Sequence, residues 1–480
     1  MSFESSRRQF LFSGSAAALL HAARPAGDPQ FWTLAEASAA LQRRTISSEE
    51  LTKLCFARIK SIDPKLNAFL TLTEEAALAQ ARQCDSARTP KPPLHGVPIA
   101  LKDNIDTAGV RTTAASRVFF DRVPAEDAEV AARLKAAGAV CLGKLNLDEM
   151  AFEGTGTTSC FGPVHNPWNP DHITGGSSAG SAAALAAGLC YASVGSDDGG
   201  SVRIPAAFCG ITGFKTTYGR VSTRGIIPSA YSLDTIGPMT RSAEDAAVML
   251  QMLAGFDPAD SITVREPVPD YAAALHAPLS GLRLGIPRDY FFENLQPDVA
   301  KAVESAIGLL RPKFRETRDV VLPRFQFVPQ GSYDVELLHY QAPFFHKTPE
   351  LYHPWSRRQL TELESVTAIH YVETLKRIRE CRRDIQRIFE DVDILLLPTK
   401  RDTAPTIRAT VDESYKRPAS NTSAFNRFGT PAMSIPCGFS SDTLPIGLQI
   451  VGRPFGEPQI LAVAYAYQQA TDWHTRRPQV

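Results

Sequence analysis

The sequence predicts an α/β protein in which helices flank a large mixed, mostly parallel central sheet. Amphipathic helical segments are followed repeatedly by short apolar segments, as in residues 128–147 and 180–197, and this alternation is typical of parallel βαβ units. The chain has 480 residues, 44% of them hydrophobic and 21% charged, which is enough for a large buried core. Length alone fits about two to four domains, or one large α/β unit with insertions.

The first part of the chain supplies two helices and then a buried strand. Residues 31–42 and 47–62 carry apolar residues at three- and four-residue spacing, which predicts helices. The second helix begins at SSEE, where a serine can cap the helix and two acidic residues follow it. Residues 94–105, LHGVPIALKDNI, predict a buried strand leaving a turn, with Lys102 at the strand end.

The block from about residue 260 to 420 is more irregular, and it contains an aromatic-rich stretch at 325–355. Aromatic side chains bury large apolar areas, so we expect these residues to belong to the core rather than to a pocket. In this block and after it we expect strands at 282–287, 394–399, 432–438 and 446–452, and helices at 296–314, 364–390 and 457–472.

Residues 1–27 differ in composition from the rest of the chain. Arg7 and Arg8 stand in SRRQFL before an apolar run from Phe10 to Leu20, and this pattern resembles a twin-arginine export signal. The run is too short to span a bilayer, so we expect no stable membrane insertion. The pattern predicts a periplasmic or secreted protein; a ragged basic terminus is the alternative.

Charge and cysteine usage exclude several classes of protein. Lys plus Arg and Asp plus Glu number 51 each, which argues against a nucleic-acid partner. The eight cysteines form no C-x-x-C motif and no His/Cys cluster with zinc spacing. We therefore expect no metal site and no disulfide scaffold, although one or two disulfides remain open for an exported chain.

Three segments carry candidate chemistry: ALKDNID with Lys102, the loop GGSSAGS at 175–181, and GSDDGGSVRIPA with Ser201. None of the ten histidines stands in a motif with this serine, so another base is needed. A buried lysine can serve because desolvation disfavours its charged form, and a loop serine can relay the proton. The loop also matches G-x-S-x-G around Ser178, but the preceding HNPWNPDHIT favours a loop over the strand that an α/β-hydrolase elbow requires.

The same segments resemble those of the amidase signature family, hydrolases of carbon–nitrogen amide bonds. LHGVPIALKDNID, GAVCLGKLNLDEMAF, GPVHNPWNPDHITGGSSAGSAAALAAG, GSDDGGSVRIPAAFCGITGFKTTYGRVS and SLDTIGPMTRSAEDAA follow in the family's order, with a return near 394–455. The resemblance implies a single amidase domain over 28–480. Its signature core would lie at about 94–250 and its variable, substrate-side block at about 260–420.

The resemblance also implies a catalytic triad. Carried over to this chain, Lys102 is the base, Ser177 relays the proton after a cis peptide bond with Gly176, and Ser201 is the nucleophile. The implied oxyanion hole consists of backbone N–H groups at Asp198, Gly199, Gly200 and Ser201. Ser178, Asp197 and Arg203 are expected to support these groups, and a purely structural ion pair between Asp197 and Arg203 is the alternative.

Asp198 departs from the family pattern, which usually has an uncharged residue such as threonine there. An inward carboxylate would repel a developing oxyanion, so we expect it to turn away or to shape the leaving-group side.

The function that this resemblance implies is hydrolysis of a small-molecule amide to an acid plus ammonia or an amine, through a serine acyl-enzyme and without a cofactor or metal. One alternative is a glutamine amidohydrolase like the A subunit of glutamyl-tRNA amidotransferase, which SLDTIGP and GSD…GGS favour. Another is an exported binding protein on a catalytically inactive amidase scaffold. The acyl and amine groups are not specified, and a homodimer is left open.

Overall fold

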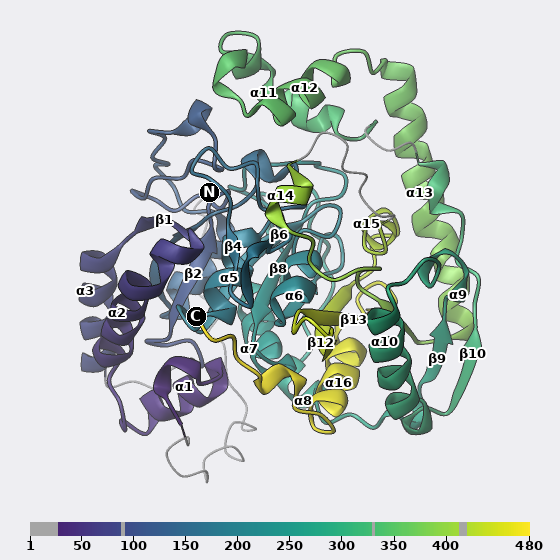
Figure 1. The fold of residues 1–480 in the computed structure, drawn as a ribbon, viewed down its shortest axis with the longest axis horizontal. Helices are drawn as coiled ribbons and strands as arrows, with labels where there is room; N and C mark the ends of the chain where they lie inside the picture. The colour runs from purple at the N-terminus through teal and green to yellow at the C-terminus, as the bar shows by residue number, and fades with distance from the viewer. Residues whose placement is uncertain (1–26, 88–91, 329–331, 412–419) are drawn as a thin grey trace, which may run out of the picture.

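Eleven strands form one sheet in the computed structural model, which describes residues 27–87, 92–328, 332–411 and 420–480. The strand order is β1-β3-β2-β6-β8-β7-β12-β13-β11-β9-β10, and helices flank the sheet (Figure 1). The strands of the sheet are β1 (Phe69–Leu72), β2 (Pro98–Lys102), β3 (Val140–Leu145), β6 (Ala192–Asp197), β7 (Thr212–Lys215), β8 (Thr235–Thr240), β9 (Arg283–Ile286), β10 (Glu316–Asp319), β11 (Ile394–Pro398), β12 (Ala432–Phe439) and β13 (Pro445–Gly452). A separate two-stranded sheet pairs β4 (His165–Asn166) with β5 (Asn169–Ile173).

The mixed α/β class is confirmed, but the prediction of a mostly parallel sheet is wrong. In the described part of the chain, the groups β3-β2-β6 and β11-β9-β10 are parallel, and the other neighbouring strands of the sheet pair antiparallel. One cause is the turn between β12 and β13, residues 440–444, which is too short for a crossover and makes a hairpin. The parallel pairs β3-β2-β6 do lie where the candidate chemistry was expected.

Helix starts follow local sequence signals. Thr33 and Ser47 each accept a hydrogen bond from the third residue of the helix that follows, and the glutamate at that position bonds back to the cap. The helices are α1 (Leu34–Gln42), α2 (Ser48–Leu66), α3 (Glu74–Ser86), α4 (Glu129–Ala136), α5 (Ala179–Ala186), α6 (Arg203–Cys209), α7 (Ala243–Leu253), α8 (Tyr271–Ala274), α9 (Arg288–Phe291), α10 (Pro297–Leu310), α11 (Val335–Phe345), α12 (Pro354–Leu363), α13 (Ala368–Asp391), α14 (Ile407–Thr410), α15 (Ser423–Arg427) and α16 (Glu457–Gln468).

The helices α11 to α13 form the upper and right-hand margin of Figure 1. The expected helix at 364–390 starts later, at Ala368, because Thr367 caps it. Phe325, Phe345 and Tyr352 are buried in apolar clusters, as expected, whereas Phe344 is 39% exposed, so only part of the aromatic stretch belongs to the core.

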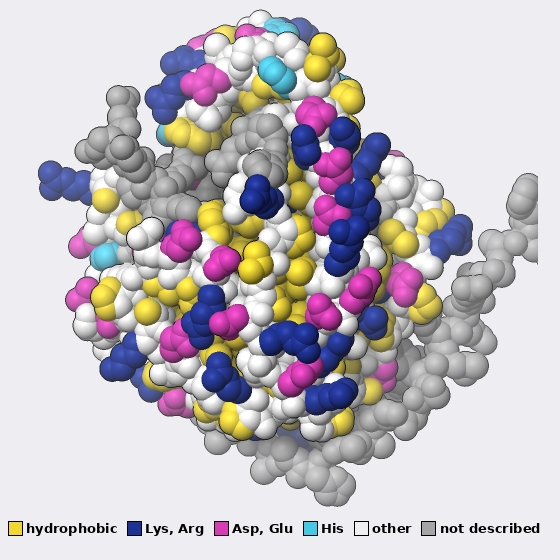
Figure 2. Space-filling view, turned by 90° about the vertical axis from the view of Figure 1, so that its right-hand side faces the viewer, with side chains coloured by type: hydrophobic (Ala, Val, Ile, Leu, Met, Phe, Trp, Pro, Cys, Tyr) yellow, Lys and Arg dark blue, Asp and Glu magenta, His cyan; other side chains and the backbone are white. Residues whose placement is uncertain are grey.

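The face that includes α13 carries acidic side chains among its basic ones (Figure 2). Arg377, for example, pairs with both Glu373 and Glu380 on the same helix. Such a surface is solvated rather than strongly basic. In the described residues no helix has the length and apolar character needed to cross a membrane. The expected export signal falls almost entirely on residues 1–26, outside the described part of the chain.

Candidate active site

Lys102 lies at the carboxyl end of β2, beside the parallel strand β6, and is 0% exposed. Its Nζ lies 2.7 Å from Ser177 Oγ and 2.9 Å from Ser196 Oγ. Burial lowers the pKa of Lys102 from its ordinary value to about 8, although Asp198, Asp148, Asp197 and Asp234 act in the opposite direction. A minority of this lysine is therefore neutral near physiological pH, and this neutral form can accept a proton.

Ser177 stands in the loop that leads into α5 and is fully buried. The peptide bond between Gly176 and Ser177 is cis, as the resemblance implied. Two backbone bonds hold this loop: Gly176 N–H donates to Gly154 O at 2.9 Å, and Asp148 N–H donates to Ser177 O at 3.2 Å. The Ser177 hydroxyl is thus held next to Lys102 by neighbours from the loop after β3.

Ser201 follows β6 at the turn into α6 and is 6% exposed. Its hydroxyl lies 3.4 Å from Asp198 Oδ1, to which it donates, while Ser229 Oγ donates to Asp198 Oδ2 at 3.0 Å. Asp198 thus points toward Ser201 and does not turn away; that it shapes the leaving-group side stays a prediction. Burial, then the neighbouring Asp197, raises the pKa of Asp198.

Asp197 and Arg203 form a fully buried, two-pronged ion pair, with bonds of 3.0 Å and 2.9 Å. Burial opposes ionisation of Asp197, but Arg203 outweighs it and holds the pKa of this carboxyl well below its usual range. Asp197 also accepts from the N–H groups of Gly200 (2.8 Å) and Val202 (3.1 Å). The pair therefore shapes the loop that presents Ser201.

The glycines of this loop differ in their surroundings. Gly200 has φ +136°, and a Cβ there would lie 2.2 Å from Thr422 Oγ1, whereas a Cβ on Gly199 would meet nothing within 4 Å. The N–H of Gly200, expected to face an oxyanion, instead donates to Asp197. Gly199 has open space at its Cα, which suits a donor that faces substrate.

Ser178 links its own loop, residues 175–181, to the segment that carries Ser196 and Ser201 by two hydrogen bonds. Its N–H donates to Ser201 O at 3.1 Å, and its hydroxyl donates to Ser196 O at 3.2 Å. Because this hydroxyl is buried and directed at a backbone carbonyl, the G-x-S-x-G match does not mark a nucleophile.

Three residues at the site were not foreseen: Asn104, Ser196 and Ser229. Asn104 Nδ2 donates to Ser196 Oγ at 3.1 Å, so both Lys102 and Asn104 bond to one hydroxyl. Ser196 belongs to the segment GSDDGGS and Asn104 to ALKDNID, so both stand in segments that carry candidate chemistry, but pairing between the segments is a tertiary property. Ser229 comes from a loop with no sequence signal.

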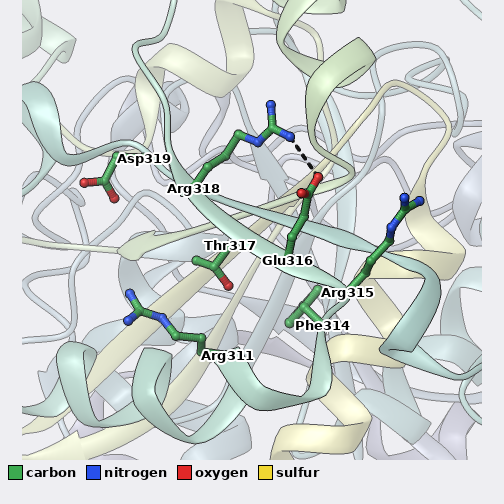
Figure 3. Close-up of a pocket in the computed structure, with 7 residues that line it drawn as sticks. All are labelled: Arg311, Phe314, Arg315, Glu316, Thr317, Arg318 and Asp319. Carbon is green, nitrogen blue, oxygen red and sulfur yellow. Dashed lines mark hydrogen bonds and ion pairs between the residues drawn. The ribbon is translucent and has the colours of Figure 1, made fainter.

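A hollow of about 510 Å³ lies elsewhere, on β10 at the edge of the sheet (Figure 3). Arg318 pairs there with Glu316, and the side chains of Arg311 and Arg315 point in different directions. None of its lining residues belongs to the Lys102–Ser177–Ser201 site. Among the residues that the structure describes, no group of three His, Cys, Asp or Glu side chains could hold a metal ion.

Comparison with known proteins identifies the architecture around these serines. A model of the family described as Amidase matches residues 50–461, most of the chain. The chain belongs to the amidase family. This amidase is 43% identical to the A subunit of glutamyl-tRNA(Gln) amidotransferase from Roseiflexus sp. (strain RS-1), over 93% of this chain and 98% of the relative.

Two further relatives extend the comparison. The A subunit of glutamyl-tRNA(Gln) amidotransferase from Methylococcus capsulatus is 45% identical to this amidase over 93% of this chain and 98% of that protein. A crystal structure of a peptide amidase with the inhibitor chymostatin has a TM-score of 0.84 and 31% identity, and the match covers 93% of this chain and 99% of that one. The amidase is therefore an enzyme that acts on carbon–nitrogen bonds.

The predicted periplasmic or secreted location is wrong. The relatives that match this amidase over most of its length are named as A subunits of glutamyl-tRNA(Gln) amidotransferase, and an enzyme named for a tRNA does not fit an exported protein. A pair of arginines before a short apolar run is a weak pattern, because basic and apolar residues occur together at many chain ends.

Proposed function

We propose that this amidase hydrolyses an amide by a serine acyl-enzyme route, with Ser201 as nucleophile, Ser177 as relay and Lys102 as base. The observation that carries the proposal is the 2.7 Å contact between Lys102 Nζ and Ser177 Oγ in a site where the lysine is 0% exposed. A lysine that is desolvated and bonded to a hydroxyl is suited to general base catalysis.

The first step is a relayed proton transfer. Neutral Lys102 takes the proton of Ser177, Ser177 takes the proton of Ser201, and Ser201 Oγ attacks the amide carbonyl. In the described residues the Ser201 hydroxyl is bonded to Asp198, so it must first rotate about its Cα–Cβ bond toward Ser177. Substrate entry, which brings a carbonyl to the Gly199 backbone, would favour this rotation.

The second step reverses the proton path. Lys102 returns its proton through Ser177 to the leaving nitrogen, the carbon–nitrogen bond breaks, and the acyl group stays on Ser201. Water then attacks the ester, with the same relay removing its proton, and the acid leaves. The net reaction consumes one water and yields an acid plus ammonia or an amine.

For the substrate, the carboxamide of glutamine is the first candidate. It is supported by the relatives of 43% and 45% identity, whose names describe components of an amidotransferase for glutamyl-tRNA(Gln). In that role the released ammonia would pass to a partner protein of the same complex. The second candidate is a broader amide substrate, supported by the likeness to a peptide amidase.

The test combines covalent labelling with product release. A fluorophosphonate should label the wild-type chain at Ser201, and Ser201→Ala should lose both labelling and ammonia release while keeping its thermal unfolding midpoint. A panel of glutamine, C-terminal peptide amides and simple aliphatic and aromatic amides then separates the two substrate candidates. Labelling at Ser178 in place of Ser201 would refute the proposed triad.

A further inference from the structure

The proposed relay requires the lone pair of neutral Lys102 to point at Ser177. The three triad residues alone do not fix that direction. A neutral amine has two N–H bonds and one lone pair, and only the lone pair can accept a proton. Lys102 Nζ contacts two hydroxyls, Ser177 Oγ at 2.7 Å and Ser196 Oγ at 2.9 Å. The relay works only when the lone pair of Lys102 faces Ser177. One N–H of Lys102 must then donate to the Ser196 hydroxyl.

Ser196 is held in place to do this. It lies near the carboxyl end of β6, where its backbone oxygen accepts from Ser178 Oγ at 3.2 Å. Its hydroxyl is bonded on the other side by Asn104 Nδ2 at 3.1 Å. Two donors from the carboxyl end of β2, Lys102 and Asn104, therefore converge on one oxygen.

Asn104 is itself fixed by the loop between β7 and β8. It is 1% exposed, its amide also donates to Ile227 O at 3.4 Å, and its backbone oxygen accepts from Ile227 N at 2.9 Å. Such a buried amide has few alternative rotamers. It holds the Ser196 oxygen without placing a charge next to the base.

The neutrality of Asn104 is significant because of the charges already present. The carboxylates that act on Lys102 are Asp198, Asp148, Asp197 and Asp234, from the end of β6 and from the loops that follow β3 and β6 and precede β8, and each favours the ammonium form. A further carboxylate at position 104 would add to them and oppose the effect of burial.

We infer that Ser196 and Asn104 are positioning residues that hold one N–H of neutral Lys102, so that its lone pair faces Ser177. The inference rests on the proposed function, because it assigns a direction to the proposed base. Neither residue touches the substrate carbonyl in this scheme, and both act through Lys102.

The experiment measures the rate at which a fluorophosphonate labels Ser201 in the full chain as a function of pH. Ser196→Ala should slow labelling by about 100-fold, the scale expected when a reacting group is misoriented. Ser193→Ala is the matched control, since Ser193 is a fully buried serine of the same strand whose hydroxyl donates to Ser181 O at 3.0 Å. This control should label at the wild-type rate.

Asn104→Asp gives an independent readout that a merely structural role would not produce. The added carboxylate should move the acidic limb of the labelling profile to higher pH, because it stabilises protonated Lys102. Wild-type rates in Ser196→Ala, or an unmoved limb in Asn104→Asp, would overturn the inference. If one variant does not fold, as judged by circular dichroism, the other decides. Failure of the proposed function would appear separately, as labelling that persists in Ser201→Ala.

Discussion

Two opposing effects act on the pKa of Lys102, and their balance determines the pH range in which the proposed site is active. Burial lowers its pKa and four nearby carboxylates raise it, and the net result is a pKa of about 8. Fully desolvated lysines can reach lower pKa values than this, so the acidic surroundings keep the base only partly neutral near pH 7.

The first prediction concerns pH. Lys102 accepts a proton only when neutral, so kcat/KM should rise with pH and reach half of its plateau near pH 8, the pKa of this lysine. Free lysine, with a pKa of about 10.4, would give a limb more than two units higher. Initial rates across roughly pH 6 to 10 measure this. A profile without an acidic limb would show that Lys102 is not the base.

The second prediction concerns Asp198, whose carboxylate is the largest electrostatic influence raising the pKa of Lys102. Asp198→Thr should therefore lower that pKa and shift the acidic limb of kcat/KM to lower pH. Asp319→Thr, at a carboxylate 67% exposed on β10, is the control and should leave the limb in place. Identical limbs in wild type and Asp198→Thr would mean that the carboxylate does not act on the base.

At the scale of elements, the turn from β6 into α6 is the structure that presents Ser201, the proposed nucleophile. Asp197, inside the turn, accepts a hydrogen bond from the N–H of Gly200. Thr422, from the loop before α15, donates its hydroxyl to Gly199 O at 2.7 Å. The turn is thus held by segments more than 200 residues apart in the chain.

The third prediction compares the two glycines of that turn. Gly200→Ala should lower the free energy of unfolding by at least about 1–3 kcal/mol, since alanine would be strained at φ +136° and would collide with Thr422. Gly199→Ala should be close to neutral for stability, because its Cβ would meet no atom within 4 Å. Urea denaturation of both variants checks this, and equal losses would contradict the assignment.

The fourth prediction concerns the buried ion pair beneath the turn. Arg203→Leu leaves Asp197 charged and without its partner at 0% exposure, which should cost about 3–5 kcal/mol of stability. Arg377→Leu, which breaks two exposed pairs on α13, should cost about 1 kcal/mol or less. Urea denaturation of both proteins measures the difference. Comparable losses would show that the Asp197–Arg203 pair contributes no more than a surface pair.

At the scale of the whole molecule, the core holds the chain together without cross-links. All eight cysteines lie in the described residues and none is joined in a disulfide there, although Cys190 lies near Cys55 in the interior. Packing of the apolar core, rather than disulfide bonds, therefore holds the described residues together.

The fifth prediction follows from these thiols. A reductant such as dithiothreitol should leave the thermal unfolding midpoint unchanged, and titration of the denatured, unreduced chain should find all eight thiols. A midpoint that falls on reduction would reveal a disulfide, with Cys55 and Cys190 the first pair to examine by mass spectrometry. A loss of stability of about 2–4 kcal/mol is typical for such a bond.

The sequence by itself determined the elements and the reacting groups. Helix caps such as Ser47, the buried strand ending at Lys102, and the glycine-rich turns around Ser177 and Ser201 are local patterns, in which nearby residues set the backbone conformation. Together with the family resemblance, they identified the members of the proposed triad before any contact between them was known.

Only the tertiary structure decided how these groups face one another. The sheet is largely antiparallel at its centre, Asp198 points at Ser201, Gly200 N–H is taken by Asp197, and Asn104 meets Lys102 at the Ser196 hydroxyl. Each of these four features depends on segments that are distant in the chain. The order of the strands is set by which apolar faces can be buried together. Side-chain direction, in turn, is set by the partners that this packing brings near.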